Sequence, residues 1–110
     1  FSKDTGKTFS SPIIIDDSMP LGRVDIDWID NKNVIVSWIK STETSSNILA
    51  KVVHIDDGKG RDFFVEAIPQ GRISGYPQVE VIDKRALFAW TENNQKTSVA
   101  TKWISLNQLR

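Results

Sequence analysis

Apolar and polar positions alternate along short segments of the chain, with the two-residue period that is typical of β-strands. Residues 24–28 read Val-Asp-Ile-Asp-Trp, which puts all three apolar side chains on one face. Residues 34–39 form a nearly continuous β-branched run, which predicts a central strand covered on both sides. Since no segment has a helical apolar period, we expect very little helix. Further strands are predicted over 48–55, 63–68, 79–82, 86–91 and 98–106.

Two stretches about 50 residues apart resemble each other, a spacing typical of repeat proteins. Residues 22–38 read GRVDIDWIDNKNVIVSW, and residues 75–90 read GYPQVEVIDKRALFAW. Aligning the initial glycines and the final tryptophans requires one deleted residue, and residues 48–51 then match 98–101. Short polar turns at 30–33, 41–47 and 56–60 separate the strands. Four antiparallel strands in each repeat predict the blades of a β-propeller.

The predicted blades do not coincide with the ends of the sequence. We expect residues 1–19 to hold a turn and the last strand of a preceding blade, with that strand over 9–16. Residues 20–68 are then a complete blade, and residues 76–110 a final blade that lacks its fourth strand. On this interpretation the chain is the C-terminal part of a longer propeller, or a piece cut from one. Because about two blades leave open edges and apolar faces, we expect self-association.

Composition excludes several classes of function. The 110 residues contain 14 Lys and Arg against 14 Asp and Glu, so the charge balance favours neither nucleic acid nor an anionic membrane. No apolar run is long enough for a membrane span. Cysteine is absent, and the single histidine, His54, falls inside a predicted strand. We therefore expect no metal, no cofactor and no Ser-His-Asp triad.

Residues 2–9, Ser-Lys-Asp-Thr-Gly-Lys-Thr-Phe, have the form S-x-D-x-G-x-T-[WF]. Asp4 is expected to fold its carboxylate onto nearby backbone N–H groups, and Gly6 to supply a positive φ. Phe9 is expected to anchor the turn in apolar packing. The pattern resembles the Asp-box of sialidases and other repeat propellers, in which Ser2 and Thr8 are also structural residues. Most Asp-boxes lie on the face opposite the active site, so the resemblance implies a scaffold role.

With the Pro-Ile-Ile-Ile segment that follows and the two repeated units, the whole chain resembles BNR-repeat, exo-α-sialidase-like bacterial proteins. The resemblance implies an all-β, sialidase-like propeller, exported to the periplasm or the cell exterior. Loops at the starts of inner strands, and those between second and third strands, would reach the substrate face. The charged or polar candidates there are Asp16, Asp17, Arg23, Glu43, Arg72, Tyr76 and Glu92.

Sialidases hold the substrate carboxylate with three arginines, and use a tyrosine nucleophile activated by a glutamate together with an aspartate acid. The resemblance implies catalytic roles for Tyr76 and Glu92. It also implies that Arg23 and Arg72 bind a glycan or another small anionic ligand, since guanidinium groups match carboxylates. Pro77 stands where a serine is common, and only two arginines are present. The alternatives are an aromatic residue that lines the channel and two surface charges.

Two functions remain open at this point. The chain is a fragment of a glycan-directed, sialidase-like protein and is inactive alone, or it is a non-catalytic propeller used for binding or assembly. Four tryptophans recur at matching strand positions. We expect them to pack between blades rather than to stack on sugars. They are Trp28, Trp38, Trp90 and Trp103.

Overall fold

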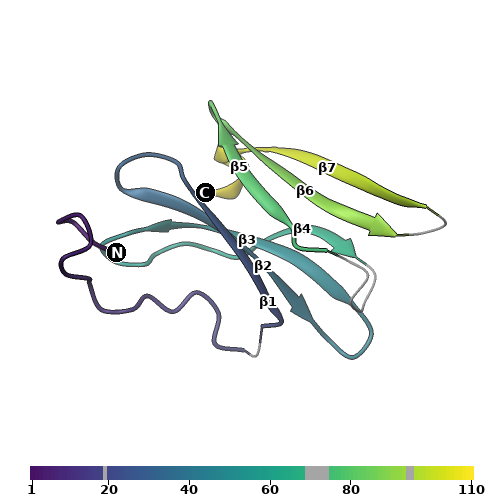
Figure 1. Cartoon of the computed structure of the whole chain (residues 1–110), viewed down its shortest axis with the longest axis horizontal. Helices are drawn as coiled ribbons and strands as arrows, with labels where there is room; N and C mark the ends of the chain where they lie inside the picture. The colour runs from purple at the N-terminus through teal and green to yellow at the C-terminus, as the bar shows by residue number, and fades with distance from the viewer. Residues whose placement is uncertain (19, 69–74, 94–95) are drawn as a thin grey trace.

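The computed structural model describes residues 1–18, 20–68, 75–93 and 96–110, and it is all-β apart from one short helix (Figure 1). A first sheet has the strand order β1-β2-β3-β4 and a second sheet the order β5-β6-β7, with all pairs antiparallel. Neither sheet closes on itself. The strands are β1 (Gly22–Trp28), β2 (Asn33–Ser41), β3 (Ser46–His54), β4 (Phe63–Ile68), β5 (Gln78–Ile82), β6 (Arg85–Asn93) and β7 (Thr97–Ser105).

The predicted all-β fold and its antiparallel sheets are confirmed, with strand ends that shift by one or two residues. The largest difference in kind is at the end of β7, where Leu106 begins a helix, α1 (Leu106–Leu109). Ser105 caps α1, because its hydroxyl accepts the Asn107 N–H and the Gln108 side chain accepts the Ser105 N–H. Arg61 holds this turn by donating to the carbonyls of Gln108 at 2.7 Å and Arg110 at 3.2 Å.

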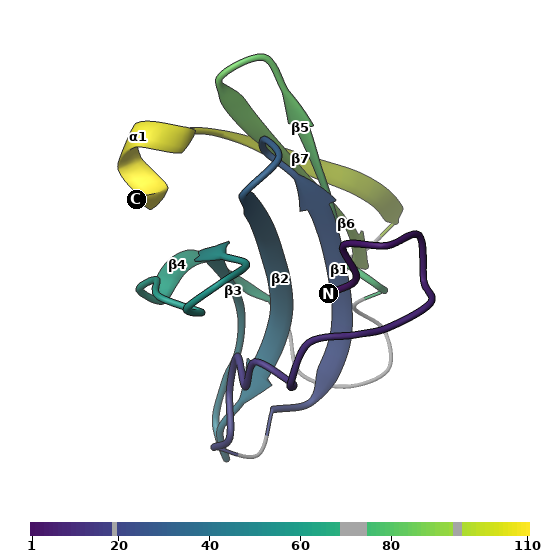
Figure 2. The same cartoon turned by 90° about the vertical axis from the view of Figure 1, so that its left-hand side faces the viewer.

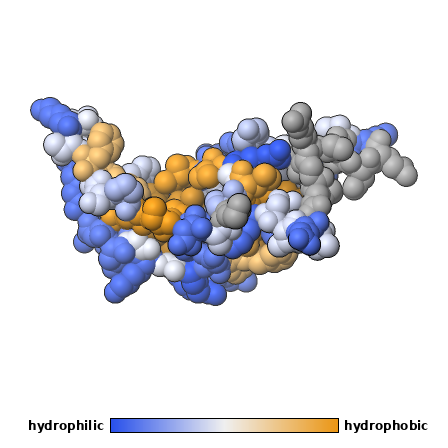
Figure 3. All heavy atoms as spheres, turned by 90° about the horizontal axis from the view of Figure 1, so that it is seen from below, coloured by the Kyte–Doolittle hydropathy of each residue, from blue (hydrophilic) through white to orange (hydrophobic). Residues whose placement is uncertain are grey.

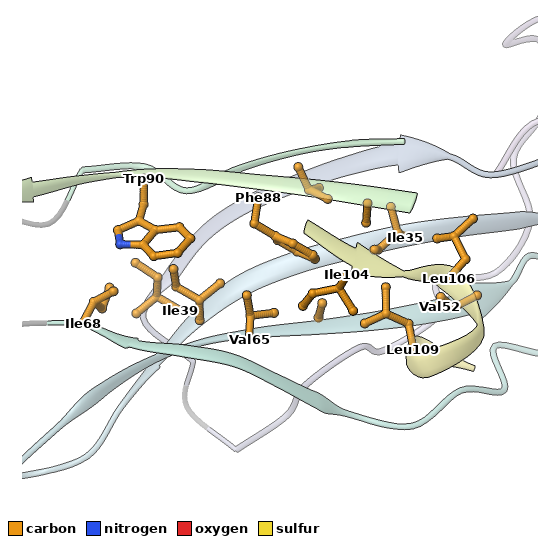
Figure 4. Close-up of a cluster of buried hydrophobic side chains, with 14 residues drawn as sticks. Ile35, Ile39, Val52, Val65, Ile68, Phe88, Trp90, Ile104, Leu106 and Leu109 are labelled. Carbon is orange, nitrogen blue, oxygen red and sulfur yellow. The ribbon is translucent and has the colours of Figure 1, made fainter. Parts of the chain in front are cut away.

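The two sheets stack face to face, and their facing side chains form one apolar cluster (Figures 2 and 4). Ile35 and Ile39 of β2 enter it from the first sheet, and Phe88 and Trp90 of β6 from the second. Leu106 and Leu109 of α1 close one end of the space between the sheets. We call this the inner cluster: Ile35, Ile39, Ile48, Ala50, Val52, Val65, Ile68, Val79, Ala86, Phe88, Trp90, Ile104, Leu106 and Leu109.

The N-terminal segment covers part of the opposite face of the first sheet (Figure 1). There Val34, Val36, Trp38 and Val53 form an outer cluster, against which Phe1, Ile13 and Ile15 pack. The strand predicted over residues 9–16 is wrong, because the described segment has no strand assignment and no ladder partner. Its alternation is nevertheless real. Ile13 and Ile15 point toward the sheet, whereas Ile14 is 69% exposed.

The apolar face of β1 points away from the inner cluster. Val24, Ile26 and Trp28 are 63%, 52% and 54% exposed, although they lie on the same face as the outer cluster. The N-terminal segment leaves them largely uncovered, and an apolar area is visible on this side of the molecule (Figure 3). Asp25 and Asp27 alternate with them and face the second sheet.

Candidate functional site

Arg23 and Tyr76, two of the predicted site residues, lie together at the ends of the sheets where β1 and β5 begin. Gly22 and Arg23 have φ values of 94° and 54°, and the β1–β2 register shifts there, as in a β-bulge. The bulge directs the Arg23 guanidinium over the Tyr76 ring, 5.4 Å from its centroid. Arg23 Nη1 also donates to the Gly75 carbonyl at 3.4 Å. Tyr76 remains 69% exposed.

Glu92 and Arg72, the other two residues to which the resemblance gives a role, do not complete a catalytic arrangement in the described part of the chain. Glu92 is half-buried in β6, where it pairs with Ser98 of β7, and no hydrogen bond joins it to Tyr76. Arg72 lies outside the described residues. A tyrosine nucleophile needs a base within hydrogen-bond reach, and the described residues provide no such contact.

Asp16 belongs to this end of the molecule but has a structural environment. It accepts hydrogen bonds from the Ser18 hydroxyl, the Ser18 amide at 2.8 Å and the Trp38 indole at 2.8 Å. The Lys40 ammonium lies 3.8 Å away. The hydrogen bonds from Ser18, then the one from Trp38 and the Lys40 charge, lower the pKa of Asp16 to about 2. Asp16 therefore anchors the indole as a carboxylate and is poorly suited to act as an acid near neutral pH.

In the turn over residues 2–9 the Asp4 carboxylate folds back onto the backbone, as predicted. Asp4 accepts the Thr8 N–H at 2.9 Å and the Thr8 hydroxyl at 2.6 Å, which chiefly lower its pKa to about 2. The Ser2 hydroxyl accepts the Gly6 N–H, and Gly6 has a φ of 86°. The expectation for Phe9 is wrong. Its side chain is 73% exposed and does not anchor the turn in a core.

The turn lies at the opposite end of the first sheet from Arg23. The Lys3 ammonium contacts the Asp56 carboxylate at 2.9 Å, just after β3, and Phe1 lies 6.0 Å from Trp28 at the end of β1. The Lys3 side chain, by hydrogen bond and charge, lowers the pKa of Asp56. These two contacts therefore hold the turn against the sheet, far from the end where Arg23 and Tyr76 meet.

Two aspartates of β1 join the sheets, a role that the sequence analysis missed. Asp25 Oδ1 accepts the Ile26 N–H at 2.9 Å, and its Oδ2 accepts the Val79 N–H of β5 at 2.9 Å. Asp27 Oδ1 accepts the Trp28 N–H at 2.9 Å, and its Oδ2 accepts the Val81 N–H of β5 at 2.7 Å. Each carboxylate thus links backbone groups of two strands. We call Asp25 and Asp27 the carboxylate clamps.

The clamps connect positions that the repeat alignment makes equivalent. Ile26 matches Val79 and Trp28 matches Val81, so each clamp binds the same backbone N–H group of two successive units. In the same alignment Gln78 and Glu80 take the places of Asp25 and Asp27. The signal available in the sequence was this recurrence of side-chain acceptors at matching positions of the two units.

A second pair of equivalent contacts involves lysines. Val36 and Phe88, each two residues before the matched tryptophan, pair with Lys51 and Lys102 respectively. This register corrects the sequence alignment, which matched Lys51 with residue 101. Lys51 donates to the Ile15 carbonyl at 3.1 Å, and Lys102 donates to the Val65 carbonyl of β4 at 2.8 Å. The segment ending at Ile15 therefore sits against the first sheet as β4 sits against the second.

The four tryptophans differ in their surroundings. Trp38 and Trp90 are buried, and each points from its own sheet toward the part of the chain that precedes it. Trp38 donates to Asp16, whereas the Trp90 indole N–H is buried without a hydrogen-bond partner in the described structure. Trp28 and Trp103 are 54% and 45% exposed, so these two do not pack between the two sheets of the described structure.

Comparison with known proteins gives no further assignment. No family model, no curated protein and no solved structure matches the chain. Among the described residues, no cluster of three or more His, Cys, Asp or Glu side chains has the arrangement of a metal site. In the same part of the chain, no helix has the length and apolar character required to cross a bilayer.

Proposed function

We propose that the chain consists of two successive units of a sialidase-like repeat propeller that serves non-catalytic binding or assembly. The observation that carries the proposal is the repeated contact between units. Carboxylate clamps bind equivalent backbone groups of β1 and β5, and two equivalent lysines bind carbonyls of the preceding unit. Contacts that recur at equivalent positions are typical of stacked repeats, in which each unit buries its apolar face against the next.

The candidate catalytic residues favour this non-catalytic interpretation. The Arg23 guanidinium lies over one face of the Tyr76 ring, and Glu92 makes no hydrogen bond to Tyr76. Asp16 is held as a carboxylate by its hydrogen bonds to Ser18 and Trp38. An enzyme of the sialidase type would need a nucleophile within hydrogen-bond reach of its base, and a protonated acid facing the leaving group across the substrate.

The proposal is tested by two measurements on the intact chain. Sedimentation velocity across the micromolar range should give masses above 12.4 kDa that rise with concentration. A fluorogenic sialoside should show no hydrolysis above background. A strictly monomeric chain would contradict the assembly role. Hydrolysis that the Tyr76→Phe variant abolishes would contradict the non-catalytic role.

A second candidate function, recognition of a glycan carboxylate or another small anion, is favoured by the contact between Arg23 and Tyr76. An exposed aromatic ring beside a guanidinium offers a stacking surface and a charged donor within one small area. Titration with N-acetylneuraminic acid, followed through the backbone amide signals of Gly75 and Tyr76, tests it. We expect signal shifts that the Arg23→Ala variant removes, and unshifted signals would exclude this ligand class.

A further inference from the structure

We propose that copies of this chain join head to tail, with the exposed face of the second sheet of one copy docked on the exposed face of the first sheet of the next. This inference rests on the proposed assembly function and adds the partner and the geometry. The template is the contact already present inside one chain, where the first sheet packs on the second through the inner cluster. The partner is therefore a second copy of the same chain.

The receiving surface is the outer face of the first sheet. Val24, Ile26 and Trp28 are each more than half exposed there. Beside them a groove of about 230 Å³ runs between the N-terminal segment and β1, over Val36 and Trp38. In the second sheet the equivalent face carries Phe88 and Trp90, and the first sheet buries both. The receiving surface is therefore apolar like the equivalent face of the second sheet, but no second sheet covers it in the described structure.

The docking surface is the outer face of the second sheet. Strand register makes Leu87 and Trp103 equivalent to Ile35 and Val52, which pair across β2 and β3 in the same way. By the same register, Val99 is equivalent to Ile48. The first-sheet residues are buried in the inner cluster, whereas Val99 and Trp103 are 72% and 45% exposed. Arg85 stacks over the Trp103 ring at 4.4 Å and, as the first residue of β6, lies at the edge of this face.

Polar groups on the two surfaces also match. Gln78 and Glu80 occupy the positions of the carboxylate clamps and are exposed on β5. Their carbonyl and carboxylate oxygens would reach the N–H groups of Ile26 and Trp28 in the next copy and share them with Asp25 and Asp27 of that copy, which already accept them. Inside one chain Asp25 and Asp27 reach the N–H groups of Val79 and Val81 in the same way. Docking therefore adds hydrogen-bond acceptors to the same backbone groups that the internal contact uses.

The N-terminal segment provides a second contact between the two copies. It lies against the first sheet as β4 lies against the second sheet, with Lys51 bound to the Ile15 carbonyl. In the described structure β7 pairs only with β6, so its other edge is open. When a second copy docks, residues 12–15 come beside that open edge and pair with it as a fourth strand. Such a contact is heterologous, since each copy contributes a different surface.

Two single substitutions test the geometry. Ile26→Arg blocks the receiving surface, and Val99→Arg blocks the docking surface. Both residues are exposed, so the monomer should fold in each case. We expect each variant alone to be monomeric, because one surface of every possible joint is blocked. An equimolar mixture should form a 1:1 dimer and nothing larger, because one competent joint remains. Sedimentation velocity measures both results.

Hydrogen exchange on the mixed dimer tests the added strand. With only the Val99→Arg copy isotope-labelled, the amides of Ile13, Ile14 and Ile15 should exchange about tenfold more slowly than in that variant alone. Phe9→Arg is the matched control, since Phe9 is 73% exposed on the turn and lies on neither sheet face. Its mass distribution should equal that of the unchanged chain, and dissociation by this variant as well would overturn the inference.

The outcomes separate the two proposals. A chain that associates, but whose two variants do not recombine into a dimer, overturns the head-to-tail joint and leaves the assembly role standing. Val99→Arg associating alone would likewise overturn it in favour of a joint between two like faces. A chain that is monomeric at every concentration overturns both the head-to-tail joint and the assembly role.

Discussion

The two faces of the first sheet are covered in different ways, and the difference shows what a repeat contact requires. On one side a whole sheet and α1 seal the inner cluster, in which Ile35 and Phe88 are fully buried. On the other side a single segment without ladder pairing covers Trp38 and leaves Ile26 half exposed. Sheet-on-sheet packing buries the full width of a face, whereas one segment buries only the strands beneath it.

The largest expected effect separates the two clusters. Phe88→Ala removes a ring from the sealed face and should lower the free energy of unfolding by about 3–5 kcal/mol. Ile13→Ala removes a half-buried side chain from the N-terminal segment and should lower it by only about 1 kcal/mol. Urea unfolding at one fixed protein concentration measures both values. Equal losses would mean that the segment stabilises the fold as much as the second sheet does.

A smaller effect compares equivalent acceptors of the two sheets. Asp27→Ala leaves the Val81 N–H without its acceptor across the sheet contact and should cost about 1–3 kcal/mol of unfolding free energy. Glu80→Ala changes the equivalent, exposed position and should stay within about 0.5 kcal/mol in the monomer. Urea unfolding, with exchange of the Val81 amide as a second readout, distinguishes them. If Asp27→Ala left the free energy of unfolding unchanged, the clamp would accompany the packing of the sheets without stabilising it.

The two buried indoles give a finer comparison. Trp38→Phe removes the donor to Asp16, whereas Trp90→Phe removes an N–H group that has no partner among the described residues. Loss of a satisfied hydrogen bond is costly, and loss of an unsatisfied donor is not. Thermal unfolding should therefore show a clear drop in Tm for Trp38→Phe and a smaller change for Trp90→Phe. The reverse order would contradict the assigned hydrogen bond.

The smallest effect is a dependence on pH at two carboxylates of the N-terminal segment. Hydrogen bonds lower the pKa values of Asp4 and Asp16 from 3.8 to about 2. A lowered pKa contributes stability that is complete above the ordinary value and is lost as pH falls toward about 2. The Thr8 amide and Trp38 indole signals should thus titrate near pH 2 in NMR spectra. Midpoints near 4 would contradict these contacts.

Sequence patterns predicted the strands of this fold well because burial on one or both faces imposes a period that local composition records. The buried run over 34–39 and the strand Phe63–Ile68 are examples. The sequence patterns failed where the structure of a segment depends on the parts of the fold that lie next to it. Residues 9–16 have strand-like alternation but no partner edge in the described structure, and Phe9 is 73% exposed.

The candidate site was harder to predict because spacing along the chain does not fix where side chains meet. Arg23 and Tyr76 do lie together, through a bulge whose positive φ at Arg23 no sequence pattern signals. The role of Asp25 and Asp27 was missed because alternating acidic residues usually indicate a solvated face. Here they face another backbone instead.

The carboxylate clamps have a consequence for how the two halves of the chain tolerate change. On β5 they recognise only N–H groups, which every amino acid except proline carries at positions 79 and 81. The partner strand is thus free to vary within the limits of packing, while the acidic side must keep its oxygens in place. Substitutions should accumulate more readily on β5 than at Asp25 and Asp27, so that neighbouring units can differ in sequence and still bind each other.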